Sequence, residues 1–175
     1  RWRLEDRPSP YVDDIVRAVR RDLAAHGTKL VIVDYLQLLR GPRSRKYRAA
    51  DREQEISDIG TEFMLASRDD GIAYLVGSQL NRECERREDK RPMVSDLRGS
   101  GTIEERAKCI VMLYRGVEYG PAVEGRDERT RADGSTYLPL DDEWATQLEL
   151  LVEKNSNGEK GRLFATFDGP TMRVS

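Results

Sequence analysis

Hydrophobic residues recur along this chain with two different periods, which predict alternating helices and strands. Between Tyr11 and Ala25, apolar side chains return every three or four positions with arginines between them, so this segment is predicted to be an amphipathic helix. Gly27 is the residue expected to end it. The run Leu30 to Val33 is apolar and rich in β-branched residues, so we expect a strand buried on both faces of a parallel sheet.

The alternation continues through the rest of the chain. Helical spacing resumes at about Arg52 and stops at Gly71. Further strands are expected at 72–76, 109–114, 146–152 and 163–167. Early strands separated by helices, followed by strands in succession, predict an α/β fold with an antiparallel margin.

Length and charge limit the kind of protein. A chain of 175 residues is long enough to bury a core, and we expect residues 1–175 to form a single domain. The segment 116–143 is rich in glycine, proline and charge, and is expected to be a surface-loop insertion. The 30 basic and 32 acidic residues nearly cancel, so any nucleic-acid binding must come from a local patch.

Hydropathy and cysteine usage indicate the compartment. No apolar run approaches the roughly 20 residues of a membrane span, so no membrane association is expected. The two cysteines, Cys84 and Cys109, lack metal-ligand spacing, which favours a reducing, cytoplasmic setting. Cys109 lies in an apolar run and is expected to pack as a small hydrophobic residue.

Three polar side chains lie at or near the ends of predicted strands. Asp34 comes directly after the first strand, where a carboxylate can meet a ligand or metal, although an acidic residue there also commonly caps a helix or turn. Gln79 follows the next strand and would lie at the same sheet edge, either contacting a γ-phosphate or serving as an ordinary loop residue. Lys154 lies at the end of a later predicted strand, where it could reach phosphates or be a hairpin residue that contacts no ligand.

A glycine-bearing segment precedes another predicted helix. Thr102 and Glu105 have the spacing of a capping box, so we expect the helix to begin there. Gly99 and Gly101 would leave backbone N–H groups free to approach a phosphate, with Arg98 beside them, which suits contact with a nucleic-acid backbone. A glycine turn with a solvated arginine is the equally open alternative.

Three blocks of sequence together resemble the C-terminal motor domain of DnaB-type replicative DNA helicases. They are LVIVDYLQLL (30–39), GSQLNRECERREDKRPMVSDLRGSGTIEERAKCIVMLYR (77–115) and VEKNSNGEKG (152–161). The middle block is specific, because SQLNR, DKRP, SDLR, SG and IE follow one another at the distances found in that family. The resemblance covers nearly the whole chain except the insertion. It implies a RecA-like α/β fold with a mostly parallel twisted sheet, flanked by helices and with an antiparallel margin at the C-terminal end.

The resemblance also implies roles for individual residues. Asp34 matches the Walker B aspartate that holds Mg²⁺, and Gln79 matches the γ-phosphate sensor, so both are expected to be catalytic and nucleotide-binding residues. Lys154 matches a basic residue offered to the nucleotide of a neighbouring subunit. The loop that grips the backbone of single-stranded DNA is matched by Arg98, Gly99 and Gly101.

Cofactors and partners follow from the same resemblance. Members of the family bind ATP and Mg²⁺, assemble as hexameric rings, translocate on single-stranded DNA and unwind duplex DNA. A primase and a helicase loader are candidate partners. We therefore expect the chain to belong to a cytoplasmic, ATP-dependent DNA helicase.

The sequence departs from the family pattern in several places. The glycine-rich phosphate loop GxxxxGK[ST] and the catalytic glutamate would lie upstream of residue 1 and do not occur here. Ser156 stands where an arginine finger is usual, and Gly99 where glutamate is common. We therefore expect a fragment or truncated relative of the motor, whose 175 residues alone hydrolyse ATP no faster than a buffer blank.

Two other functions stay open. The chain could belong to another RecA-like ring ATPase or strand-exchange protein, although the DKRP and SDLR-SG block fits the helicase loop better. It could instead be a non-catalytic module that docks onto DNA or onto a helicase ring, as Ser156 and the missing upstream motifs would allow.

Overall fold

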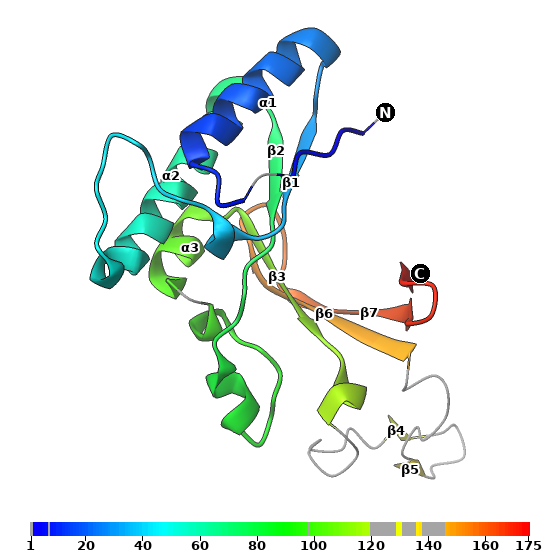
Figure 1. Ribbon diagram of the computed structural model, residues 1–175. Helices are drawn as coiled ribbons and strands as arrows, with labels where there is room; N and C mark the ends of the chain where they lie inside the picture. The colour runs from blue at the N-terminus through cyan, green and yellow to red at the C-terminus, as the bar shows by residue number, and fades with distance from the viewer. Residues whose placement is uncertain (1, 7, 98, 120–128, 131–135, 138–145) are drawn as a thin grey trace. The chain divides into compact units, whose positions relative to one another are not determined.

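The computed structural model describes residues 2–6, 8–97, 99–119, 129–130, 136–137 and 146–175. The helices are α1 (Val12–His26), α2 (Arg52–Asp70) and α3 (Ser100–Arg106) (Figure 1). The strands are β1 (Leu30–Val33), β2 (Ala73–Val76), β3 (Cys109–Tyr114), β4 (Arg129–Thr130), β5 (Thr136–Tyr137), β6 (Gln147–Asn155), β7 (Gly161–Asp168) and β8 (Arg173–Val174).

The chain divides into two compact units. The first consists of Arg1–Gln79 with Leu97–Ala107, and the second of Leu80–Asp96 with Lys108–Ser175. Whether they act together as the expected single domain stays a prediction. No helix in the described parts of the chain is long and apolar enough to cross a membrane.

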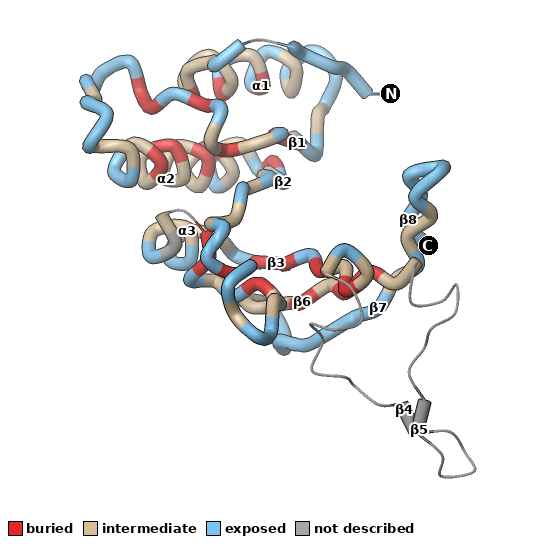
Figure 2. The backbone as a smooth tube through the Cα atoms, turned by 60° about the horizontal axis from the view of Figure 1, so that its bottom comes forward, coloured by how far each residue is buried: buried red, intermediate tan, exposed pale blue. Residues whose placement is uncertain are grey.

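In the first unit, α1 and α2 pack on one face of the parallel pair β1–β2. Val31 lies opposite Tyr74 and Val33 opposite Val76, so these four side chains share a face. They contact a hydrophobic core whose helical members are Val12, Val16, Ile56, Ile59, Phe63 and Ala66. Figure 2 shows buried positions recurring along α2. The parallel pairing expected for the first two strands is confirmed.

The other face of β1–β2 is exposed. Leu30, Ile32 and Leu75 are 52%, 68% and 59% exposed. The prediction of a strand buried on both faces is therefore wrong for the part of the chain that the structure describes. An apolar run has the side chains that burial on both faces would require, but the run does not determine which elements cover each face.

Glycine ends the two long helices. Gly27 has φ 67° and its N–H donates to the carbonyl of Leu23 at 2.8 Å. Gly71 has φ 65° and donates to Ser67 at 3.0 Å. Glycine adopts this left-handed conformation without a Cβ penalty, so the ends predicted from the sequence are confirmed.

The start of α3 differs from the prediction. The helix begins at Ser100, with Gly99 as its N-cap at φ 77° and no side-chain cap. Thr102 therefore lies inside the helix, and the capping box expected for Thr102 and Glu105 is wrong. The left-handed turn at Gly99 directs the chain into the helix two residues early.

The second unit contains an antiparallel sheet with strand order β3-β6-β7-β8. It confirms the antiparallel C-terminal margin. The parallel part is smaller than expected, because β1 and β2 are the only described strands that pair in parallel, besides an isolated parallel bridge between Tyr11 and Arg40. Most of the expected insertion at 116–143 lies outside the described residues. Its described parts are the 3₁₀ turn Gly116–Tyr119 and the antiparallel pair β4–β5.

Side chains alternate across β3. Ile110, Met112 and Tyr114 are buried, whereas Cys109 faces outward with its second neighbour Val111. The prediction that Cys109 packs in the interior is therefore wrong. The period of two in a strand overrides the apolar character of the run.

Candidate functional site

Asp34 and Gln79 lie at the same edge of the β1–β2 pair. Asp34 directly follows β1, and Gln79 is the third residue after β2. The strand-end loops stay paired beyond the ladder, because the N–H of Gly77 donates to Val33 at 2.9 Å and that of Leu36 donates to Gly77 at 2.8 Å. Asp34 and Gln79 thus follow neighbouring parallel strands at the same sheet edge, and their joint contact with a ligand stays a prediction.

Both side chains are open to a ligand. They are exposed, and within the described residues neither the Asp34 carboxylate nor the Gln79 side-chain amide has a hydrogen-bond or ion-pair partner. Gly77 lies beside the carboxylate, since a Cβ on this residue would be in ordinary van der Waals contact with Asp34 Oδ1 at 3.8 Å. A charged acceptor and a neutral donor at one edge can bind a metal-bound phosphate.

Asp34 is a single carboxylate, and this limits the kind of metal ion that it could help to bind. Among the described residues, no three or more histidine, cysteine or acidic side chains gather into a metal cluster. Mg²⁺ is usually held by one or two carboxylates, with waters and substrate phosphates completing its coordination. One carboxylate such as Asp34 can supply a single ligand to an ion of this kind, and its role in holding Mg²⁺ stays a prediction.

Gln37 is a further residue of this site that the sequence did not single out. Its side-chain carbonyl accepts the backbone N–H of Gln79 at 3.0 Å, and its amide donates to Ser78 Oγ at 3.0 Å. The available signal was a polar residue three positions after Asp34 in an otherwise apolar stretch.

The predicted DNA-binding residues are described only in part. Arg98 lies outside the described residues. Gly99 precedes α3, and a Cβ on it would approach Ile56 Cγ2 to 3.3 Å. Gly101 is exposed in the first turn of α3, and a Cβ there would have no atom within 4 Å. Their contact with DNA stays a prediction.

The two glycines should respond differently to substitution. Gly99→Ala is expected to lower the stability of the purified protein by about 1–2 kcal/mol, because alanine is strained at positive φ. Gly101→Ala is the matched control: it meets no atom and should be neutral or stabilising by up to about 1 kcal/mol. Thermal unfolding measures both, and equal effects would contradict this description of the α3 start.

Lys154 belongs to the second unit. It lies on β6, half-buried and opposite Ile110 of β3. Ser156 follows the strand, and its N–H donates to the carbonyl of Lys108 at 2.8 Å. The expected contact of Lys154 concerns the nucleotide of another subunit, and it stays a prediction.

The loop 80–96 of the second unit contains an ion pair between the partly exposed Arg87 and the buried Asp96. Arg87 donates from both terminal nitrogens to Asp96, at 2.9 and 2.6 Å. Asp96 is 5% exposed, and Met93 donates its N–H to the same carboxylate at 2.8 Å. Burial opposes ionisation of Asp96, but these hydrogen bonds hold the pKa of its carboxyl below the ordinary value.

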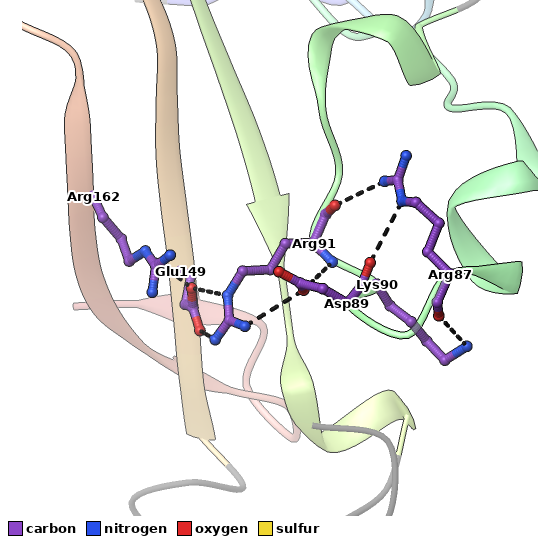
Figure 3. Close-up of polar contacts among 6 residues, drawn as sticks. All are labelled: Arg87, Asp89, Lys90, Arg91, Glu149 and Arg162. Atoms are coloured by element: carbon purple, nitrogen blue, oxygen red, sulfur yellow. Dashed lines mark hydrogen bonds and ion pairs between the residues drawn. The ribbon is translucent and has the colours of Figure 1, made fainter. Parts of the chain in front are cut away.

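A second pair attaches this loop to β6 (Figure 3). Arg91 donates to both oxygens of Glu149, at 3.0 and 2.9 Å. Arg162 Nε lies 3.6 Å from the same carboxylate. The Arg91 guanidinium also stacks over the Tyr114 ring at 5.0 Å, and its hydrogen bonds to Glu149 raise its pKa. Glu149 lies outside every motif that the sequence pattern indicates.

These pairs explain part of the specific middle block. Arg91 belongs to DKRP and Asp96 to SDLR, and both are satisfied by neighbouring protein groups. Arg87, Arg91 and Asp96 thus hold the loop in place.

The family model described as "DnaB-like helicase C terminal domain" matches residues 2–175. Replicative DNA helicase DnaB of Geobacillus stearothermophilus is 32% identical over 164 residues, which cover 94% of this chain and 31% of that protein. Replicative DNA helicase DnaC of Bacillus subtilis is 31% identical, with the same coverage. The chain thus spans about a third of the length of these relatives.

Two solved structures have a similar fold. A DnaB-like replicative helicase, studied for its interactions with primase, has a TM-score of 0.73 and 28% identity over 94% of this chain and 35% of that one. The second structure is an ATPase domain, with a TM-score of 0.76 and 27% identity over 95% of this chain and 51% of that one.

Proposed function

Because the chain belongs to the family of DnaB-like helicase C-terminal domains, we propose that it forms part of the ATP-driven motor of a hexameric replicative DNA helicase. This motor translocates on single-stranded DNA and unwinds duplex DNA. The observation that carries the proposal is the exposed pair of Asp34 and Gln79 at one edge of β1–β2. The likeness to the structures of a replicative helicase and of an ATPase domain supports a RecA-like fold.

In this proposal Asp34 and Gln79 serve a nucleotide. Asp34 holds Mg²⁺, which when bound neutralises charge on the β- and γ-phosphates of ATP. Gln79 donates its side-chain amide to a γ-phosphate oxygen and transmits the nucleotide state to the loop that follows. Lys154 reaches the nucleotide of a neighbouring subunit.

The proposed partners follow from the family. Arg98, Gly99 and Gly101 contact the backbone of single-stranded DNA, and six copies form a ring. A primase is supported as a partner because the similar DnaB-like helicase was studied for its interactions with primase. A helicase loader and a cytoplasmic location complete the proposal.

A comparison of two polypeptides tests it. Residues 1–175 contain no GxxxxGK[ST] loop, so this segment alone should hydrolyse ATP no faster than buffer. The full-length protein, meaning the longest reading frame that contains these residues, should show Mg²⁺-dependent hydrolysis stimulated by single-stranded DNA and should separate a forked duplex.

The alternatives give different results in the same assays. A non-catalytic docking module would bind DNA or a helicase ring while the full-length protein shows no ATP hydrolysis. A strand-exchange ATPase would hydrolyse ATP without separating a forked duplex. Either outcome would contradict the helicase proposal.

A further inference from the structure

Gln37 links the two strand-end loops that carry Asp34 and Gln79. Its Oε1 accepts the backbone N–H of Gln79, and its Nε2 donates to Ser78 Oγ, each at 3.0 Å. Both groups of one amide are therefore used on two successive residues of the loop after β2. An amide with a donor and an acceptor can make both contacts at once, which a carboxylate or a hydroxyl does less readily.

The backbone of Gln37 is itself held in place by hydrogen bonds. It lies in the 3₁₀ turn Leu36–Leu38, and Arg52 donates to its carbonyl at 2.8 Å. Arg52 also donates to the carbonyl of Leu39 at 3.2 Å. Arg52 is the first residue of α2, a helix whose apolar face is buried in the core of the first unit. The turn is thereby anchored to that helix.

In the loop after β2, the residues that follow Gly77 are attached to the Asp34 loop through Gln37. Backbone hydrogen bonds between the two loops reach Gly77, which donates to Val33 and accepts from Leu36. Within the described residues, the hydrogen bonds of Ser78 and Gln79 are those made with Gln37. Without this side chain, the segment that carries the Gln79 amide would lose its attachment to the Asp34 loop.

We propose that Gln37 is a positioning residue, which fixes the backbone of Gln79 so that the Gln79 amide meets the γ-phosphate beside Asp34. The inference rests on the proposed nucleotide-binding function of this edge. Gln37 acts through Gln79, because both ends of its side-chain amide are already used on the loop. A small displacement of a positioned group has a large effect on the chemical step and a small one on nucleotide affinity.

The test replaces Gln37 with methionine in the full-length protein. Gln37→Met keeps the length of the side chain and removes both hydrogen bonds. We expect kcat for ATP to fall about tenfold, with KM changed by less than about twofold and an unchanged thermal midpoint. Gln54→Met is the matched control, because it loses an exposed hydrogen bond to Asp58 at 3.0 Å on α2. It should leave kcat at the wild-type value.

A double variant separates positioning from general support. In the Gln79→Ala background, Gln37→Met should lower kcat by less than about twofold, because the amide it positions is gone. A second tenfold loss in that background would show that Gln37 supports the fold only, and would overturn the inference. If Gln37→Met does not fold, Ser78→Ala removes one of the two contacts and should lower kcat by a smaller factor that also disappears in the Gln79→Ala background.

Failure of the inference can be told from failure of the proposed function. If Asp34→Ala retains full turnover, the nucleotide site itself is wrong. If Asp34→Ala abolishes turnover while Gln37→Met retains the wild-type kcat, the site stands and the positioning role is refuted.

Discussion

Arg91→Met is expected to destabilise the second unit by about 3–5 kcal/mol, because it leaves the Glu149 carboxylate without its two hydrogen bonds from Arg91. The side chains of Arg91 and Glu149 are 16% and 7% exposed, so water cannot replace the missing guanidinium. Arg162, at 3.6 Å from the same carboxylate, places the expected loss at the lower end of this range. The midpoint of urea unfolding and hydrogen exchange of residues 80–96 measure the effect.

A surface pair provides the control for this variant. Arg68 and Asp69 lie 3.0 Å apart with side chains 71% and 48% exposed, so Arg68→Met should cost less than about 1 kcal/mol. The double variant Arg91→Met/Glu149→Met should regain most of the stability, because it buries two apolar side chains in place of a carboxylate that has lost its two hydrogen bonds from Arg91. A loss for Arg91→Met no larger than that for Arg68→Met would contradict the structural role of the pair.

The edge shared by Asp34 and Gln79 could be predicted because it follows from local pattern. Two apolar runs separated by an amphipathic helix give parallel neighbouring strands, and the carboxyl ends of such strands meet. β1 and β2 pair in this way in the structure. The left-handed end of α1 at Gly27 was predictable for the same reason, since it depends on one residue and its immediate neighbours.

Contacts between distant segments could not be predicted. Glu149 lies 58 residues from Arg91, and nothing near either residue in the sequence indicates their contact. The prediction for Cys109 was wrong because side chains alternate between the two faces of β3, and Cys109 lies on the exposed face. The exposed face of β1–β2 depends on elements that a local apolar run does not specify.

Gln37 shows a third limit of pattern reading. It stands within a block that carried the family resemblance, but a glutamine has no preference that reveals which backbone group it will meet. Its role became visible only with the geometry of Ser78 and Gln79. The middle block also contains charged residues whose role is structural. Arg87, Arg91 and Asp96 form ion pairs that hold the loop in place.

Asp34→Ala in the full-length protein is expected to lower Mg²⁺-dependent ATP turnover by about 100-fold or more. A metal bound at the phosphates contributes several kcal/mol to transition-state stabilisation, and each 1.4 kcal/mol corresponds to about tenfold in rate. Asp34 has no hydrogen-bond or ion-pair partner in the described part of the chain, so its removal should leave the fold and the thermal midpoint unchanged. The loss should therefore appear in activity alone.

The measurement that tests the proposed function most directly is the steady-state rate of ATP hydrolysis by the full-length protein, with Asp34→Ala and Asp69→Ala compared at saturating Mg²⁺ and single-stranded DNA. Asp69 is an exposed carboxylate at the end of α2 and serves as the matched control. We predict near-background turnover for Asp34→Ala and the wild-type rate for Asp69→Ala. Equal, wild-type turnover in both variants would contradict a nucleotide site at the edge of β1–β2.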